Sequence, residues 1–189
     1  MTATRSSPVV LLAGVPGAGK TETLREIKRR APWLRVSDPE PVRDCLRRIL
    51  PWVPYTVARP FVHTIAHIAA FCRILRRGGP PVVVHDPGTR RWSRLLISGL
   101  AHAAGRDAEA VYIDVGHEAA LRGQERRGRV VRRPAFDRHW RRWTELRTRN
   151  LAGEGLGSGE GWSRIALTTR DRAVDDVLAL VFADGTGRL

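Results

Sequence analysis

The 189-residue sequence contains little cysteine and no long apolar segment, and each shortage excludes a class of protein. Cys45 and Cys72 are too few for a disulfide framework, so we expect two buried thiols in a reducing compartment. No segment approaches the roughly 18 apolar residues of a membrane span, so no membrane partner is expected. The apolar run near the N-terminus is short and is interrupted by Pro16 and Lys20, which argues against a signal peptide. These absences together predict a cytoplasmic protein.

Lysine and acidic residues are scarce as well. Lys20 and Lys28 are the only lysines among 33 basic residues, and 19 acidic residues leave a formal net charge of +14. Such a surplus favours an anionic partner or substrate, nucleic acid included. Codon bias would explain the choice of arginine over lysine better than it explains the surplus of charge. The length and the 42% apolar content predict one domain over residues 1–189, and the oligomeric state stays open.

The clearest motif is a glycine-rich loop that follows the apolar run Val9–Leu12. The loop reads GVPGAGKT, which is the G-x-x-x-x-G-K-T pattern of a phosphate-binding loop. Its glycines let backbone N–H groups turn toward phosphates, and the positive end of the following helix faces the same charge. We expect Lys20 to bind the β- and γ-phosphates and the Thr21 hydroxyl to ligate Mg²⁺. The predicted ATP site consists of Gly14, Val15, Pro16, Gly17, Ala18, Gly19, Lys20, Thr21 and Glu22.

Apolar segments typical of strands alternate with amphipathic segments typical of helices. We predict strands at 8–13, 33–37, 81–85, 110–115 and 164–168, and helices at 20–30, 42–50, 60–77, 91–104 and 174–182. The alternation predicts an α/β three-layer sandwich with a five-stranded parallel sheet, whose ligand lies beyond the carboxyl ends of the strands.

Two further segments have helical periodicity. Residues 122–149 contain eleven arginines and three acidic residues, and Phe136, Trp140 and Trp143 would form the inward side of a basic amphipathic helix. In the helix at 60–77, we expect the stripe formed by Phe61, Ile65, Ile68, Cys72 and Leu75 to face the core.

Some side chains near that helix have two interpretations. Trp52, Tyr55 and Phe61 could form aromatic walls of an acceptor pocket or belong to the core. His63 and His67 lie four residues apart but have no third ligand nearby, so packing is favoured over a metal site.

Two missing motifs narrow the class of phosphate-loop protein. No N-K-x-D motif is present to recognise guanine, and the third strand ends in His85-Asp86-Pro87 without the second carboxylate of a mechanical ATPase. A phosphotransferase remains, and its base must lie elsewhere. We predict that Asp38, at the end of the second strand, is the general base, with a turn or helix cap as the alternative. Asp86 is predicted to bind a Mg²⁺-coordinated water, with a simple loop aspartate as the alternative.

Four motifs follow one another along nearly the whole chain: GVPGAGKT, VSD before a basic helix, VVVHDPGTRR, and the arginine-rich stretch after AVYIDV. In this order they resemble the small P-loop kinases grouped with polynucleotide kinase, zeta toxin and chloramphenicol phosphotransferase, often labelled AAA-family ATPases. The resemblance implies that Asp38 is the general base. It also implies that Arg43 and Arg90 contact the substrate, although Arg43 lies five residues after Asp38 rather than three.

The same resemblance implies an arginine-rich lid at about 116–135. The lid arginines of the family fall on Arg122 and Arg126, with Arg127 as a substitute. Arg122 and Arg126 share a helical face and could together clamp the transferring phosphoryl group. A solvated basic face is the alternative.

These features favour an ATP-dependent phosphotransferase acting on a hydroxyl of a small molecule or a nucleic-acid end. The alternative is a P-loop ATPase that serves as a nucleotide-dependent switch, with the basic stretch as its docking surface. Nucleic-acid binding alone would leave the phosphate loop unexplained.

Overall fold

The computed structural model describes residues 7–37, 44–45, 47–49, 51–52, 55–76, 79–126, 128 and 130–183, with the side chains of 55–63, 66 and 183 outside the description. Five strands form one sheet: β1 (Val9–Ala13), β2 (Arg35–Ser37), β3 (Val82–His85), β4 (Ala108–Ile113) and β5 (Arg164–Thr168). Their order is β2-β3-β1-β4-β5 and every pair is parallel. The predicted five-stranded parallel sheet is therefore confirmed.

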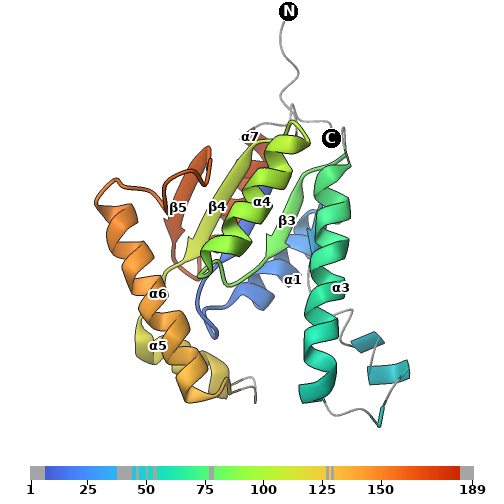
Figure 1. Ribbon diagram of the computed structural model, residues 1–189, viewed down its shortest axis with the longest axis vertical. Helices are drawn as coiled ribbons and strands as arrows, with labels where there is room; N and C mark the ends of the chain where they lie inside the picture. The colour runs from blue at the N-terminus through green and yellow to red at the C-terminus, as the bar shows by residue number, and fades with distance from the viewer. Residues whose placement is uncertain are drawn as a thin grey trace, which may run out of the picture.

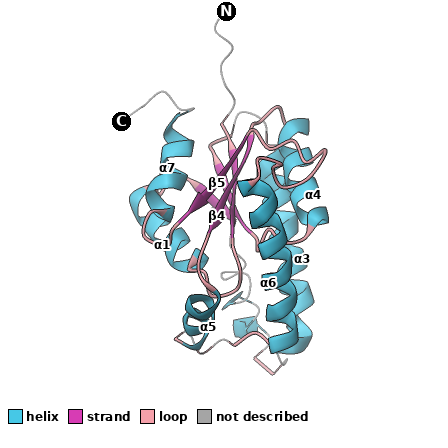
Figure 2. Ribbon diagram, turned by 90° about the vertical axis from the view of Figure 1, so that its left-hand side faces the viewer, coloured by secondary structure: helices cyan, strands magenta, loops and turns pink. Residues whose placement is uncertain are grey.

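The helices are α1 (Lys20–Arg30), α3 (Tyr55–Leu75), α4 (Arg91–Ala103), α5 (His117–Glu125), α6 (Arg133–Leu151) and α7 (Ala173–Ala183). Helices α1 and α7 cover one face of the sheet, and α3, α4 and α6 cover the other (Figures 1 and 2). Helix α5 lies beyond the carboxyl ends of the strands. The predicted α/β three-layer sandwich is thus confirmed, and no helix in the described residues is long and apolar enough to cross a membrane.

The core is centred on β1, because this strand lies between β3 and β4 and both of its faces are covered. All five of its side chains are fully buried. The glycine-rich loop connects this strand directly to the N-terminus of α1. On the side of α1 that faces the sheet, Leu24 and Ile27 are fully buried. The start of α1 is thereby held against the carboxyl edge of the sheet, where an α/β protein binds its ligand.

The arginine-rich stretch spans the end of one helix and the whole of another. Helix α5 ends at Glu125 and α6 begins at Arg133. The predicted basic amphipathic helix is α6, and it has the predicted orientation. Phe136 and Trp143 are buried, and the Trp143 ring stacks on Tyr112 of β4 with centroids 5.0 Å apart. These aromatic contacts hold α6 beside α4.

Helix α3 differs from the prediction in its start and in its orientation. It begins at Tyr55, so Pro60 is not in its first turn. The side facing the core consists of Ala70 and Ile74, while Ile68 of the predicted inner stripe is 54% exposed. Both sides of α3 are apolar, and a helical period alone does not say which side packs.

The predicted burial of the cysteines is also wrong. Cys72 lies on the outer side of α3 and is exposed, and Cys45 is exposed in the helical turn at residues 44 and 45. Periodicity places Cys72 on an apolar stripe, and in the structure the described part of that stripe is turned outward.

At the amino ends of the strands, the buried side chain of Arg106 joins three segments. Its guanidinium donates to the carbonyls of Ser7 (2.7 Å) and Pro80 (2.6 Å), and with longer bonds to Pro8, Arg73 and Ile74. Burial lowers the pKa of this arginine, and the nearby charge of Arg35 adds to the effect. Because these carbonyls precede β1 and β3 and end α3, one side chain ties that edge of the sheet together.

Candidate active site

The glycine-rich loop connects β1 to α1 and has the backbone geometry that only glycine adopts without strain. Gly14, Gly17 and Gly19 have φ angles of 143°, 88° and 110°. Gly17 also has no room for a side chain, because a Cβ there would lie 2.0 Å from the carbonyl oxygen of Ala120 in α5. Gly19 is the residue before the first turn of α1. The loop therefore leads directly into the N-terminus of α1. Its backbone N–H groups and the positive end of the helix can face the same phosphate.

Lys20 is held over this loop. Its side chain is 6% exposed, and Nζ donates to the carbonyl oxygens of Gly14 (2.7 Å) and Val15 (3.0 Å). A phosphate placed in the loop would offer its oxygens to the same ammonium group. Thr21 is buried beside it in the first turn of α1, whereas Glu22 is exposed.

Asp86 follows β3 and is buried. Its Oδ1 accepts hydrogen bonds from the Gly88 N–H (2.7 Å) and the Ser93 hydroxyl (2.9 Å), which close the turn into α4. In the described part of the chain, no donor bonds to Oδ2, so that oxygen is available to a water on a metal. The donor set of Thr21 and Asp86 fits Mg²⁺, which keeps several waters and takes phosphate oxygens as ligands.

Among the described residues, no group of three or more His, Cys, Asp or Glu side chains could hold a metal ion. His67 stacks on Phe71 (centroids 5.9 Å apart) and meets the edge of Trp92 (6.3 Å), which confirms a packing role for this histidine.

His139 of α6 joins the site from a helix far away in the sequence. Its Nδ1 is hydrogen-bonded to the Thr89 hydroxyl at 2.7 Å. Burial lowers the pKa of His139 to about 4, and the positive charges of Lys20, Arg90 and Arg142 contribute. The imidazole is therefore neutral at pH 7, and its surroundings are strongly positive.

Arg170 lies in the turn after β5 and contacts the phosphate loop directly. Its guanidinium donates to the carbonyl oxygens of Gly17 (3.0 Å) and Ala18 (3.2 Å), and its stem packs on Gly19. The position of Arg170 near a strand end is evident from the sequence, but its contact with residues 152 and 153 positions earlier is not.

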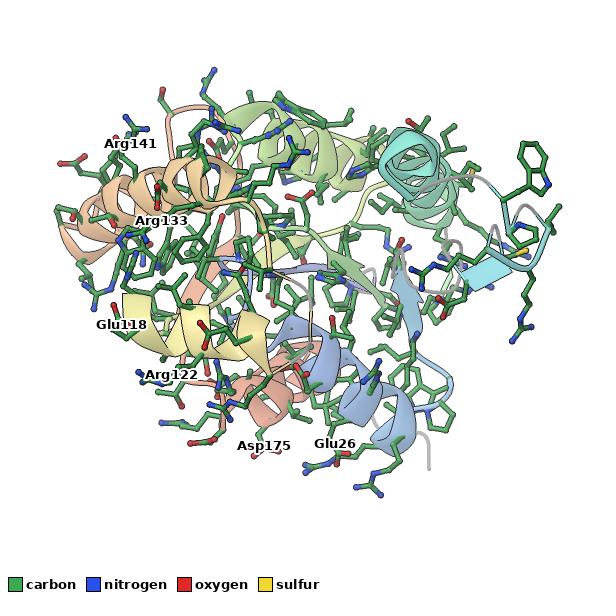
Figure 3. All side chains as sticks on the ribbon, turned by 90° about the horizontal axis from the view of Figure 1, so that it is seen from below. Glu26, Glu118, Arg122, Arg133, Arg141 and Asp175 are labelled. Carbon is green, nitrogen blue, oxygen red and sulfur yellow. The ribbon has the colours of Figure 1, made fainter. Side chains whose placement is uncertain are left out.

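Helix α5 covers the other side of the loop. Gly123 approaches the Gly17 carbonyl so closely that a Cβ would lie 2.3 Å from its oxygen, and the Gln124 side chain donates to the Pro16 carbonyl at 3.4 Å. Arg122 lies on the exposed side of this helix (Figure 3), and Arg126, the residue after its last turn, is exposed as well. The structure thus places α5 against the phosphate loop and both arginines away from that contact.

Three predicted site residues, Asp38, Arg43 and Arg127, lie outside the described residues. Ser37, which precedes Asp38, ends β2 and is buried at the edge of the sheet next to β3. Trp52 is 76% exposed and is therefore not a core residue.

A cavity of about 640 Å³ lies between the start of α4 and the middle of α6. Arginine predominates in its lining, and Arg90 is one of the lining residues. Neither the cavity nor the contact of His139 with Thr89 could be read from the sequence, because both depend on where α6 lies relative to α4.

Comparisons with known proteins agree with this fold. No curated protein matches the sequence. A solved structure from the PezAT chromosomal toxin-antitoxin system of Streptococcus pneumoniae is similar with a TM-score of 0.63, 16% identity and coverage of 95% of this chain and 80% of that chain.

Two further structures are nucleotide complexes. Chaetomium thermophilum Kti12 with ADP-AlF3 has a TM-score of 0.56, 18% identity and coverage of 95% and 100%. The Mycobacterium tuberculosis APS kinase with AMPPNP and APS has a TM-score of 0.51, 18% identity and coverage of 94% and 99%. These likenesses show a shared fold. The family model described as "AAA domain" matches residues 9–149, so the chain belongs to this family of P-loop, kinase-like AAA domains.

Proposed function

We propose that this protein is an ATP-dependent phosphotransferase that moves the γ-phosphate of Mg-ATP to a hydroxyl group. The proposal rests on the carboxyl edge of the sheet. There the loop of Gly14, Gly17 and Gly19 carries Lys20, and Asp86 is the single carboxylate that follows β3. Without a second carboxylate after β3 to activate water, transfer to an organic hydroxyl is favoured over hydrolysis. The nucleotides bound by Kti12 and the APS kinase support ATP as the donor.

Each residue then has a defined task. Lys20 and the N–H groups of the loop bind and orient the phosphates. Thr21 would ligate Mg²⁺ and Asp86 would hold one of its waters, and the bound ion would offset the charge of the transferring group. Asp38 would accept the proton of the acceptor hydroxyl, a role supported by the place of the preceding residue, Ser37, which ends β2 at the carboxyl edge next to β3.

The arginines around the loop divide into two groups. Arg170 contacts the loop carbonyls and supports its conformation. Arg122 and Arg126 remain the proposed clamp, and they would have to swing over the loop from the exposed side of α5 when the substrates bind.

The test is whether ADP release requires an acceptor. The protein is incubated with Mg-ATP and a panel of metabolites and oligonucleotides, and mass spectrometry searches for the gain of one phosphate. We expect slow ADP release with ATP alone and acceptor-dependent release together with the mass gain. The Lys20→Ala variant, which lacks the phosphate-binding ammonium, is the negative control. ADP release at full rate without any acceptor would contradict the proposal and favour the nucleotide-dependent switch.

A further inference from the structure

The cavity between α4 and α6 has an unusual lining for its size. Its volume of about 640 Å³ suits a small organic ligand, and such pockets are mostly apolar with a few polar groups. Here five arginines line it, together with one carboxylate: Arg90, Arg91, Arg94, Arg142, Arg149 and Glu145.

Two of these arginines are neutralised by structural carboxylates. Arg94 is 3% exposed and makes two hydrogen bonds of 2.7 Å to the buried carboxylate of Glu160. Arg149 lies 3.4 Å from the Glu154 carboxylate. Their charges are therefore compensated, and they form part of the cavity wall.

Arg90, Arg91 and Arg142 are different. In the described residues none of them has a carboxylate within ion-pair distance, and Arg91 donates only to the neutral carbonyl of Ser158 at 3.1 Å. Three cations around one cavity repel one another, and an anion between them would remove that repulsion.

The helix ends add to the positive potential. Helix α4 begins at Arg91, has Arg90 as its N-cap and contains no acidic residue in its first turn. Acidic residues stabilise this end of a helix, and arginines here oppose the helix dipole. A sequence that breaks a local rule in this way commonly does so at a functional site.

The cavity adjoins the turn that contacts the phosphate loop. The carbonyl of Pro87, two residues before Thr89, accepts a hydrogen bond from the Gly14 N–H of the loop at 3.2 Å. Thr89 lines the cavity and is hydrogen-bonded to His139, whose pKa is lowered in part by Lys20 and in part by Arg90 and Arg142. The Lys20 ammonium and the cavity arginines therefore act on the same imidazole. A ligand held in the cavity could extend past Thr89 toward the γ-phosphate position.

We propose that the cavity between α4 and α6 binds a phosphate monoester group of the acceptor through Arg90, Arg91 and Arg142. This inference rests on the proposed function, since it names the acceptor class as a small phosphorylated alcohol. We commit to a small molecule because the volume suits one, whereas a nucleic-acid strand would follow the exposed arginines of α6 as well.

The test compares two neighbouring arginines of α6. Arg142 lines the cavity, whereas Arg141 is exposed, does not line it and points outward from α6 (Figure 3). Calorimetry measures the binding of ribose 5-phosphate, with ribose as the uncharged probe, to protein saturated with Mg-ADP. We expect ribose 5-phosphate to bind at least 10-fold more tightly than ribose. The Arg142→Gln substitution should weaken its binding by 10-fold or more, and Arg141→Gln by less than 2-fold.

Two further variants exclude simpler explanations. Compared without nucleotide, because Lys20→Ala weakens nucleotide binding, the protein and Lys20→Ala should bind ribose 5-phosphate equally, which shows that the probe is not in the phosphate loop. Arg90→Gln should reproduce the loss seen in Arg142→Gln, and thermal unfolding confirms that each variant is folded.

Three results would overturn the anion site. The first is equal affinity for ribose and ribose 5-phosphate, and the second is an equal loss of ribose 5-phosphate affinity in Arg141→Gln and Arg142→Gln. The third is displacement of ribose 5-phosphate by a single-stranded oligonucleotide whose own binding requires both Arg141 and Arg142. The last of these would indicate nucleic acid bound along the whole of α6.

The anion site and the phosphotransfer reaction can fail separately. If the probe binds as expected but no compound in the acceptor panel gains a phosphate, the site stands and the proposed reaction is contradicted. If an acceptor is phosphorylated with the same KM by the protein and by Arg142→Gln, the reaction stands and the site is overturned.

Discussion

Arg106 lies at the amino ends of the strands and Arg90 lies near their carboxyl ends, and the two guanidinium groups are satisfied in different ways. Arg106 is buried and donates to the carbonyls of three converging segments. Arg90 is exposed beside a cavity and has no ion-pair partner in the described residues. One arginine is used entirely by the fold, while the other is available to a ligand.

This contrast shows how to interpret the charge of +14. Arg94 is paired with the buried Glu160 carboxylate, and Arg106 donates to backbone carbonyls. The positive charge of these two arginines therefore does not indicate a ligand. The arginines that do indicate one, such as Arg142, lie at the same edge as Lys20. The net charge of a chain therefore says less about the ligands it binds than the charged side chains that have no ion-pair partner within the fold.

The largest expected effect is the loss of activity on substituting Lys20, at the carboxyl edge of the sheet. Lys20→Ala should abolish phosphoryl transfer and sharply weaken ATP binding, because Lys20 supplies the ammonium held over the phosphate loop. Turnover and ATP affinity are measured beside Lys28→Ala, which removes the other lysine from the exposed side of α1. Both variants should stay folded, and unchanged turnover in Lys20→Ala would contradict the assignment of the phosphate loop.

Substituting Arg106, at the amino ends of the strands, should instead affect stability and leave ATP binding unchanged. Arg106→Met keeps an apolar stem but leaves buried carbonyls without a donor, so it should lower the free energy of unfolding by about 3 kcal/mol. Urea unfolding measures the loss, with the exposed Arg141→Met as the control. The folded fraction should bind ATP normally, and weakened ATP binding without loss of stability would contradict a purely structural role for Arg106.

A third substitution tests the base at the carboxyl edge. Asp38→Asn should lower turnover by roughly 10²-fold while ATP affinity is nearly unchanged, because a general base acts on the acceptor and not on the nucleotide. Single-turnover kinetics and nucleotide titration separate the two effects. Weakened ATP binding with normal turnover would instead assign Asp38 to the metal site.

The smallest expected effect concerns the pH dependence of stability. The pKa of His139 is about 4 in the folded protein and near its usual 6.5 when unfolded, so the unfolded chain binds the extra proton between these values. His139 therefore lowers stability as the pH falls from about 6.5 toward 4, by about 1 kcal/mol for a partly exposed group.

Urea midpoints of the protein and of His139→Gln at pH 7.5 and 4.8 measure this contribution. The variant should lose less stability on acidification, because glutamine does not take up the proton. Equal losses would show that burial and the neighbouring charges do not lower the pKa of His139 in the folded protein.

Much of the fold could be predicted because its signals are local. The boundaries of α1 and β5 agree with the prediction, since a glycine-rich loop and short β-branched or apolar runs define them. The fourth strand lies two residues earlier than predicted, at Ala108–Ile113, because Glu109 interrupts its apolar run. The orientation of α3 could not be predicted, because both of its sides are apolar and only packing against the sheet selects one.

For the site, the sequence by itself determined the phosphate loop and the positions of Lys20, Thr21 and Asp86. These residues are consecutive or directly follow strands, and parallel strands bring their carboxyl ends to one edge. Their chemistry is therefore contained in short segments.

Only the tertiary structure decided which arginines adjoin that chemistry. His139 reaches Thr89 because Trp143 stacks on Tyr112 and holds α6 against the sheet, and Arg170 reaches the phosphate loop because β5 ends close to it. The sequence shows a surplus of arginine, whereas packing pairs some of these charges with buried carboxylates or carbonyls. Three of the other arginines, Arg90, Arg91 and Arg142, line one cavity because α4 and α6 lie on the same face of the sheet (Figure 2).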